Sequence, residues 1–402
     1  MDRVILLSDC DAFYASVETL LNPSLAGKPL AVAGDPKDRH GVVVARNQLA
    51  KGFGVRTTDT VSEARRKCPE ITFVPPHHER YREVSARVNA LYLEYTDLVE
   101  PYSVDESYLD ITHISSRTGA DVAGEIRRRV REEVGITVSI GVSFCRCFAK
   151  LASEFNKPDG TGVILRADME RIVWPRPAGE LLYVGKRTVE ALAKLGILTI
   201  GDLAQAEPEL LARKLGKHGT QIWRYANGLD DSPVRAWDAP REVKSIGSGY
   251  TFPRDINSES EIRSNLSAMA DKVAASLRAK SLKCRAVQVS IKSPSLKVIQ
   301  RQQQLAEPTF LMSELSSAAL AIVLSNWPKG APIRALTVTA LDLIPASEAG
   351  GQMSVFDDQA ELSQREKRER LEAAVSDIRR RYGKGALRYG ADGMWRGDGE
   401  KS

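Results

Sequence analysis

The chain has 402 residues, of which 43% are hydrophobic and 27% charged, and it carries a formal net charge of +5. This composition is typical of a globular protein of about two to four domains and excludes a disordered chain. No apolar stretch reaches the roughly 20 residues of a membrane span, and an acid interrupts the short apolar run at the N-terminus, so we expect no signal peptide and a cytoplasmic protein.

The first predicted element is an apolar strand over residues 4–9, which ends in Asp9 with Asp11 just beyond it. A strand that delivers carboxylates to its carboxyl end and then turns into a helix often displays a functional site. The alternative is that one of the two aspartates caps the helix that we expect over residues 12–21. Two aromatic residues follow at once, and the pattern places them either beside the site or in the core.

The elements expected next give the first 165 residues a mixed α/β character. They are two short strands near 29–33 and 41–45, a long amphipathic helix at 78–96, the segment YSVDESYLDIT at 102–112, an arginine-rich helix at 119–134 and a strand at 135–143. This order predicts an antiparallel sheet with helices on one face, into which residues 22–75 are inserted.

The segment SVDESYLD brings two adjacent acids, Asp105 and Glu106, beside a predicted strand. Neighbours on a regular strand point to opposite faces, so both acids reach one ion only where the strand turns or twists at a hairpin. Together with Asp9 they form a candidate cluster of three carboxylates, which repel one another and therefore imply bound cations. Oxygen ligands suit Mg²⁺ or Mn²⁺, and two such ions about 4 Å apart are a known arrangement for phosphoryl transfer.

Residues 166–230 are helical in pattern and contain two turns centred on Gly185 and Gly216, each followed by a lysine. Backbone N–H groups at such turns bind phosphates, and the alternative is a plain turn of a helical hairpin. Residues 243–345 change to the order strand, helix, strand, strand, helix, strand. This order predicts a separate βαββαβ domain.

The C-terminal part follows a second linker at 346–351. The helix expected over 364–382 carries many Arg, Lys and Glu residues on one face, and its apolar face consists of Leu371, Val375, Ile378 and Tyr382. The five cysteines of the chain include no CxxC pair, and a zinc site at Cys145 and Cys147 would fit no common ligand spacing. We therefore expect reduced structural thiols.

Six segments of the chain resemble those of the Y-family DNA polymerases, above all the bacterial translesion enzymes of the polymerase IV type and the polymerase V catalytic-subunit type. In order they are DCDAFYASVE, NPSLAGKPLAV, ARNQLAKGFGVR, YSVDESYLDI, SIGVSFCRCFAKLASEFNKPDG and KSIGSGYTFPRD. The resemblance covers nearly the whole chain and implies an α+β right-hand polymerase. Its parts would be a ferredoxin-like palm (1–21 and 76–165), small fingers (22–75), a helical thumb with helix-hairpin-helix turns (166–232), a linker (233–242), a βαββαβ little finger (243–345) and a flexible C-terminal region (346–402).

The resemblance also implies which residues meet the metal ions and the incoming nucleotide. The metal ligands would be Asp9, Asp105, Glu106 and the main-chain carbonyl of Cys10. Tyr14 falls on the steric-gate position, which excludes a 2′-hydroxyl, with Phe13 beside it, and the alternative is that both rings are core residues. Lys157 falls on the lysine that contacts the triphosphate.

Two regions depart from the family pattern. Many relatives carry a Tyr and an Arg three residues apart on the triphosphate, but this chain has Gln48 and Lys51, and we infer that Arg46 and Lys51 share the phosphate charge. Tyr183 stands in the first thumb turn, where relatives usually have Gly. The DNA contacts that the resemblance implies are Gly185, Lys186 and Arg187 in the thumb and Arg241 and Lys244 in the little finger.

A short peptide after the second linker resembles the one by which bacterial polymerases bind the sliding clamp. It reads QMSVF and consists of Gln352, Met353, Ser354, Val355 and Phe356. The alternative is an apolar patch that packs on the C-terminal helix. Binding to the clamp would raise the effective concentration of an enzyme that holds DNA weakly.

We therefore expect a monomeric, error-prone translesion DNA polymerase that extends a primer on template DNA with deoxynucleotides, uses two Mg²⁺ ions or Mn²⁺, and has no proofreading domain. The fingers residues over the nascent pair would be small, as an open site requires, and they are Gly34, Val42, Val44 and Thr58. One alternative is a catalytically inactive accessory protein that binds DNA and the clamp. Another is a palm-type nucleotide cyclase, which uses the same paired acids.

Overall fold

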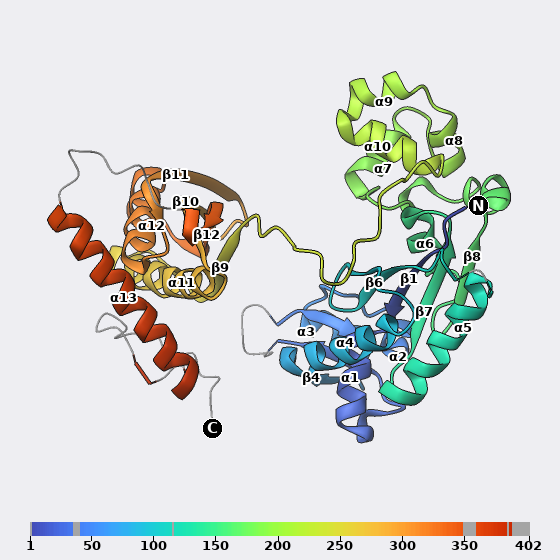
Figure 1. Cartoon of the computed structure of the whole chain (residues 1–402), viewed down its shortest axis with the longest axis horizontal. Helices are drawn as coiled ribbons and strands as arrows, with labels where there is room; N and C mark the ends of the chain where they lie inside the picture. Colours follow the sequence, from blue (N-terminus) through green and yellow to red (C-terminus); the bar gives the residue numbers. More distant parts are fainter. Residues whose placement is uncertain (1, 35–40, 115, 349–358, 384–385, 388–402) are drawn as a thin grey trace. The chain divides into compact units, whose positions relative to one another are not determined.

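The apolar run after Val4 forms strand β1 (Ile5–Cys10) in this computed structural model (Figure 1). All six residues of the strand are buried. The strand lies at the centre of a five-stranded sheet with the order β5-β6-β1-β7-β8. The other strands are β5 (Val99–Pro101), β6 (Glu106–Asp110), β7 (Val138–Ser143) and β8 (Thr161–Ile164). Because β6 and β7 both pair with β1 in antiparallel register, the carboxyl end of β1 meets the beginnings of these two strands.

The structure describes the chain apart from residues 1, 35–40, 115, 349–358, 384–385 and 388–402. The chain divides into two units, Met1–Pro240 and Arg241–Ser402. The first unit contains the sheet around β1, a small inserted sheet and a group of short helices, and the second contains a four-stranded sheet. None of the helices in the described ranges has both the length and the apolar character needed to cross a membrane.

Helices cover both faces of the first sheet. The helices α1 (Phe13–Leu21), α4 (His78–Leu93) and α5 (Gly119–Arg129), with the π-helical turn η2 (Val130–Val134), share a core with Leu6. The helix α6 (Arg146–Ala152) packs on the other face, where Ala149 meets Ile5 and Leu7. The predicted helices of this region are confirmed within a few residues and lie on one face. The prediction that only one face is covered is wrong, because α6, where no helix was predicted, covers the other face.

The prediction of a purely antiparallel sheet is also wrong, because β8 pairs with β7 in parallel. A parallel pair requires a crossover connection, and α6 lies in the connection between these two strands. Two glycines let this helix approach the strands closely. A Cβ atom at Gly141 would lie 1.9 Å from the carbonyl oxygen of Ala149, and one at Gly162 would lie 2.0 Å from that of Ala152. The sheet thereby fixes the position of α6, which carries Lys150.

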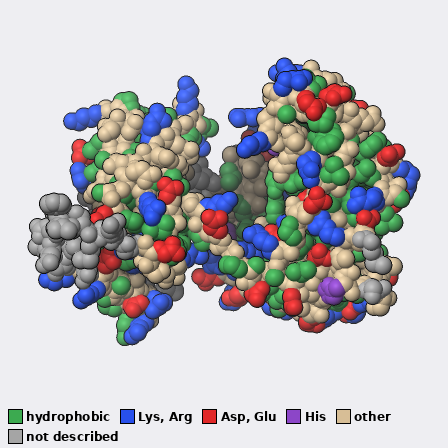
Figure 2. All heavy atoms as spheres, turned by 45° about the horizontal axis from the view of Figure 1, so that its top comes forward, with side chains coloured by type: hydrophobic (Ala, Val, Ile, Leu, Met, Phe, Trp, Pro, Cys, Tyr) green, Lys and Arg blue, Asp and Glu red, His purple; other side chains and the backbone are tan. Residues whose placement is uncertain are grey.

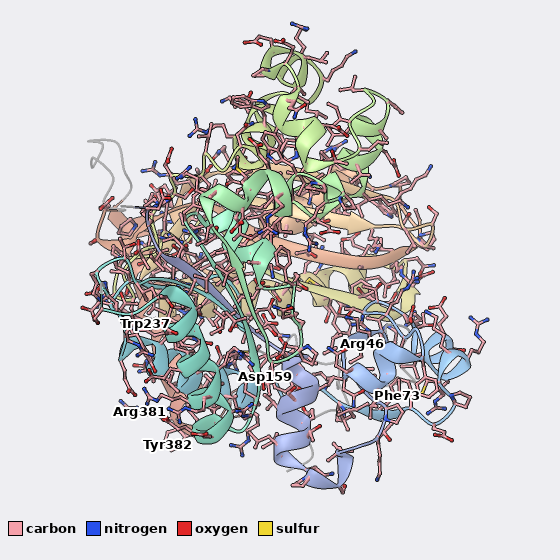
Figure 3. The ribbon with its side chains drawn as sticks, turned by 90° about the vertical axis from the view of Figure 1, so that its right-hand side faces the viewer. Arg46, Phe73, Asp159, Trp237, Arg381 and Tyr382 are labelled. Atoms are coloured by element: carbon pink, nitrogen blue, oxygen red, sulfur yellow. The ribbon has the colours of Figure 1, made fainter. Side chains whose placement is uncertain are left out.

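The inserted residues form a small sheet with the order β3-β2-β4 (Figure 1). The elements are η1 (Pro23–Leu25), β2 (Leu30–Ala33), β3 (Val43–Arg46), α2 (Gln48–Gly52), α3 (Val61–Lys67) and β4 (Thr72–Val74). They enclose a core of their own, made of Ala31, Val43, Ala50, Val55, Ala64, Cys68 and Ile71. Figure 3 labels Arg46 at the end of β3 and Phe73 on β4.

A group of short helices follows β8. It consists of η3 (Arg166–Asp168), η4 (Met169–Val173), η5 (Ala178–Glu180), α7 (Lys186–Ala193), α8 (Ile200–Gln205), α9 (Pro208–Leu215) and α10 (Lys217–Ala226). Phe144 and Phe148 join its core, so the group packs against α6. Gly216, between α9 and α10, has a φ of 64°, a conformation that glycine adopts without strain. Residues 227–245 belong to no helix or strand.

The second unit has the predicted βαββαβ order. Its elements are β9 (Ile246–Ile256), α11 (Glu259–Ala279), β10 (Leu282–Lys292), β11 (Val298–Thr309), α12 (Met312–Asn326) and β12 (Ile333–Pro345). The strands form an antiparallel sheet with the order β11-β10-β12-β9. The alternation predicted in β10 is confirmed, because Val287, Val289 and Ile291 point into the core that both helices cover.

The chain continues from β12 into η6 (Ala346–Glu348), so the first part of the predicted second linker is a 3₁₀-helix. The clamp peptide proposed at 352–356 lies outside the described residues. The C-terminal helix α13 (Gln359–Tyr382) begins five residues before the predicted start at residue 364.

The helix α13 contacts the rest of the second unit through its charged face. Glu372 accepts a hydrogen bond from the backbone N–H of Met312 at 3.0 Å and forms an ion pair with Arg278. Two residues of the apolar face, Leu371 and Tyr382, are 64% and 75% exposed. The apolar face that the sequence shows is therefore not the face that packs.

Candidate active site at the carboxyl end of strand β1

Two carboxylates face each other where β1 ends. Asp9 and Glu106 are directly opposite in the antiparallel pair of β1 and β6, so their side chains lie on the same face of the sheet. The ammonium group of Lys150, on α6, lies 2.9 Å from Asp9 Oδ2 and 2.8 Å from Glu106 Oε1. Lys157 Nζ lies 2.8 Å from the same Asp9 oxygen. The two acids and two lysines therefore form one contiguous cluster.

Burial and neighbouring charges shift the two carboxylates in opposite directions. Burial alone would raise the pKa of Asp9, but Lys150 and Lys157 outweigh burial and hold this pKa below its usual value. Burial raises the pKa of Glu106, and the negative charge of Asp9 adds to this effect, while Lys150 opposes it. The two lysines therefore stabilise the charged form of Asp9 more than that of Glu106. An added cation would stabilise the charged form of Glu106.

Asp105 belongs to the turn that leads into β6. The backbone N–H groups of Tyr102 and Ser103 both donate to the carbonyl oxygen of Glu106, at 2.8 and 3.2 Å. The chain therefore turns at the two adjacent acids, which is the condition for both of them to reach one ion. The side chain of Asp105 accepts a hydrogen bond from Ser103 Oγ at 2.5 Å.

The acids of the site surround the buried residue Cys10. The backbone N–H of Cys10 donates to the carbonyl oxygen of Asp105 at 2.9 Å, which ties the end of β1 to the turn before β6. Burial raises the pKa of the Cys10 thiol well above its usual value, and the negative charges of its neighbours add to this, in the order Asp105, Asp9, Asp11 and Glu106. The three predicted metal-binding acids therefore all lie close enough to this thiol to raise its pKa.

The donor set fits a hard divalent cation. The predicted donors are carboxylate oxygens of Asp9, Asp105 and Glu106 and the main-chain carbonyl of Cys10, and such oxygen ligands suit Mg²⁺ or Mn²⁺. Within the described residues, no three His, Cys, Asp or Glu side chains already form a metal-binding group. In the arrangement seen here, Lys150 and Lys157 supply the positive charge beside Asp9, and Asp105 is bound to Ser103.

Asp11 supports the loop that carries Lys157. Its carboxylate accepts hydrogen bonds from Ser139 Oγ at 2.7 Å and from the backbone N–H of Asp159 at 2.8 Å. Asp159, labelled in Figure 3, also forms ion pairs with arginines of α5 and η2, namely Arg127 and Arg131. The alternative that an aspartate caps the following helix is wrong. The N-cap of α1 is Ala12, and no side-chain hydrogen bond caps this helix.

One residue of the site, Lys150, is not singled out by the sequence, and the contact that Asp11 makes is not predicted from it. Lys150 lies within the segment SIGVSFCRCFAKLASEFNKPDG, where it stands seven residues before Lys157, but nothing in that spacing shows that both lysines reach Asp9. The sequence places Asp11 either at a functional site or at a helix cap, and in the structure its carboxylate holds a distant loop. The sequence does contain one indication of these contacts, because Lys150 and Asp11 are charged residues in segments that are otherwise apolar.

The two aromatic residues after the strand have different surroundings. Phe13 is 3% exposed and belongs to the core, which agrees with the alternative reading for this ring. Tyr14 is partly exposed, and its ring stacks on that of Tyr81 with centroids 4.0 Å apart and an interplanar angle of 16°. His78 meets the Tyr14 ring edge-on. The helices α1 and α4 therefore fix the Tyr14 ring in one orientation.

The predicted triphosphate contacts of the inserted sheet lie at its surface. Arg46 donates from Nε to the carbonyl oxygen of Val55 at 2.5 Å, so part of its guanidinium group is engaged within the insertion. Lys51 is exposed on α2. Val42 and Val44 are 36% and 41% exposed, which leaves a surface of small apolar side chains at this position.

The five residues predicted to contact DNA are all exposed. Gly185 is the N-cap of α7, and Lys186 and Arg187 follow it on the surface. In the second unit, both Arg241 and Lys244 are exposed. Figure 2 shows Lys and Arg side chains scattered among Asp and Glu on the face that it draws, so no single basic patch stands out there.

Comparison with protein families and curated relatives gives consistent matches along the chain. The family model described as the impB/mucB/samB family matches residues 8–154, and the model of its C-terminal domain matches residues 243–355. DNA polymerase IV of Acetivibrio thermocellus is 41% identical over 392 residues, which are 97% of this chain and 97% of that protein. DNA polymerase IV 1 of Bacillus subtilis is 36% identical, over 97% of this chain and 93% of that protein.

Among solved structures, a Y-family DNA polymerase chimera has a TM-score of 0.76 with this chain. The match covers 85% of this chain and 99% of the chimera at 22% sequence identity. At this identity the likeness shows the fold, which is the α+β architecture of a right-hand polymerase, as predicted.

Proposed function

The chain belongs to the impB/mucB/samB family, the Y-family DNA polymerases, and from this premise we propose that it is a template-directed translesion polymerase that adds deoxynucleotides to a primer end by a two-metal mechanism. The activity is that of a DNA-directed DNA polymerase, as in relatives that are 41% and 36% identical. The observation that carries the mechanism is the pair of facing carboxylates, Asp9 and Glu106, with Asp105 in the adjoining turn.

The residues that would hold the metal ions are Asp9, Asp105, Glu106 and the carbonyl of Cys10. Bound divalent cations supply activation of the attacking 3′ oxygen and stabilisation of the charge on the triphosphate. Lys150 keeps Asp9 and Glu106 at one place by contacting both. Lys157, beside Asp9, donates to the triphosphate, and we assign Arg46 and Lys51 to the same phosphates.

Tyr14 excludes ribonucleotides by its bulk. Its ring cannot shift freely, because it stacks on Tyr81 and meets His78 edge-on. A ring held in this way at the sugar of the incoming nucleotide leaves no room for a 2′-hydroxyl. Small exposed side chains such as Val42 and Val44 leave the site open, which favours error-prone copying of damaged templates.

The remaining parts hold the substrates in place. We assign palm, fingers, thumb and little finger to the ranges predicted from the sequence. The thumb turn with Gly185, Lys186 and Arg187 would bind the primer backbone, and Lys244 would contact template phosphates. The peptide at 352–356 would bind the sliding clamp. We infer that the enzyme acts as a monomer.

Extension of a primed template with an abasic site or a bulky adduct tests this function, with Mg²⁺ and Mn²⁺ supplied in turn. The expected result is extension past the lesion by the wild-type chain, without removal of a mismatched 3′ end. Binding to primed DNA with no extension under either metal would instead identify an accessory protein.

A further inference from the structure

Tyr183 has a backbone conformation that is rare for an aromatic residue. Its φ is 68°, in the left-handed region that favours glycine. It precedes Val184 and Gly185, which lead into α7. A bulky residue persists in such a conformation only where its surroundings hold it there, and outliers of this kind concentrate at functional sites.

The side chain of Tyr183 extends from the helical group to the sheet. Its hydroxyl lies 3.3 Å from the hydroxyl of Tyr102, within hydrogen-bond distance, and either group is able to donate. This contact raises the pKa of Tyr102 to about 12. The ring of Tyr183 also lies 6.1 Å from that of Tyr225 on α10. Both tyrosines of the pair are well exposed, at 42% for Tyr102 and 49% for Tyr183.

Tyr102 begins the turn that carries the catalytic acids. Its backbone N–H donates to the carbonyl oxygen of Glu106 at 2.8 Å, which closes the turn. Its ring packs edge-on against the buried ring of Tyr108, with centroids 5.6 Å apart. The position of Tyr102 is therefore coupled to that of Asp105 and Glu106 through the turn itself.

We propose that Tyr102 and Tyr183 form a positioning pair, which sets the distance between the first turn of the helical group and the turn that carries Asp105 and Glu106. This inference rests on the proposed function. If the turn before α7 holds the primer backbone, its distance from the acids determines where the 3′ oxygen lies. Small errors in such a distance lower the rate of the chemical step strongly, even when binding is little changed.

The test is single-nucleotide addition on a matched primer and template by the full-length protein. Tyr102→Phe and Tyr183→Phe remove one hydroxyl each while the rings remain. Each should lower kcat by about threefold to tenfold, as expected for a lost neutral hydrogen bond, with the KM for the nucleotide changed less than about twofold. The double variant should be no slower than either single variant, because the two hydroxyls act through one contact.

Tyr225→Phe is the matched control. Its hydroxyl accepts from Gln221 Nε2 at 3.1 Å within α10, so it bonds inside the helical group and not to the sheet. It should leave kcat unchanged. A reduction equal to that of Tyr183→Phe would show a general need for hydroxyls in this group and would overturn the proposal.

Tyr183→Gly separates positioning from stability. Glycine relieves the left-handed backbone, so the melting temperature should stay the same or rise, while kcat falls at least as far as in Tyr183→Phe. Multiplicative effects in the double variant, or an unchanged kcat in these variants of an active polymerase, would overturn the pair alone. Failure of the wild-type chain to extend any primer would overturn the proposed function and the pair together.

Discussion

Carboxylates are buried beside basic side chains both at the end of β1 and where α13 contacts the rest of the second unit. The two places differ in how these carboxylates are paired. At the end of β1, Asp9 and Glu106 compete for Lys150, and burial leaves the pKa of Glu106 raised. At α13, burial also raises the pKa of Glu372, but this carboxylate pairs with Arg278 and accepts a hydrogen bond from the N–H of Met312. In the first arrangement two carboxylates share one lysine and repel each other, which suits it to bind more positive charge, whereas the second pairs one carboxylate with an arginine and serves to hold a helix in place.

The largest expected effect is on catalysis at the end of β1. Glu106→Gln should lower the rate of nucleotide addition by at least about 10³-fold, roughly 4 kcal/mol of barrier, because the site loses a carboxylate for its metal ions. The melting temperature should change little, since the substitution also removes a repulsion with Asp9. Primer extension and thermal unfolding are the measurements, and DNA binding should persist. Extension at the wild-type rate would show that Glu106 is structural, like Glu372.

The opposite result is expected at α13. Glu372→Ala leaves Arg278, whose side chain is 8% exposed, without its buried partner and Met312 without an acceptor. The second unit should lose about 3 kcal/mol of unfolding free energy, or α13 should detach, while primer extension without a clamp stays the same. Hydrogen exchange in α13 reports the loss. The control is Asp377→Ala, which removes an exposed pair with Arg380 and should cost little.

Substitution of Lys150 at the end of β1 and of Lys283 at α13 tests whether only the first site binds metal ions. Lys150→Met leaves Asp9 and Glu106 with less positive charge, so the unfolding free energy should fall by about 2 kcal/mol without metal and recover partly when Mg²⁺ is added. Lys283→Met breaks a 2.8 Å pair with Glu369 on α13. Its smaller loss should not respond to Mg²⁺. Equal responses of the two variants in metal titrations of thermal unfolding would remove the distinction drawn here.

The sequence predicts what depends on local patterns. The strand before Asp9 and the alternation in β10 follow from apolar periodicity and are confirmed. The parallel pairing of β8 and the placement of α6 on the second face depend on the close approach at Gly141 and Gly162. Side-chain periodicity does not contain that information.

The same limit applies to the charged residues. Lys150 contacts both carboxylates because of the crossover through α6. Lys150 stands 141 positions after Asp9 and 44 positions after Glu106 in the chain. For α13, amphipathic patterning shows an apolar face, yet the charged face packs because the second unit presents Arg278 and Lys283 at the contact. The amphipathic pattern depends only on the sequence of the helix. It contains no information about the surface on which the helix packs.

The smallest expected effect concerns Tyr14, and its control is the exposed Tyr382 at the end of α13. Tyr14 is held by its stack on Tyr81, whereas Tyr382 at the end of α13 is 75% exposed. Tyr14→Ala should raise ribonucleotide incorporation relative to deoxynucleotide incorporation by at least about tenfold, roughly 1.4 kcal/mol of lost discrimination, because the ring no longer fills the space of a 2′-hydroxyl. Tyr14→Phe should keep most of the exclusion, since the ring supplies the bulk. Tyr382→Ala should leave the ratio unchanged. Steady-state incorporation of matched ribo- and deoxynucleotides measures all of these ratios, and an unaltered ratio in Tyr14→Ala would make Tyr14, like Phe13, a residue of the core.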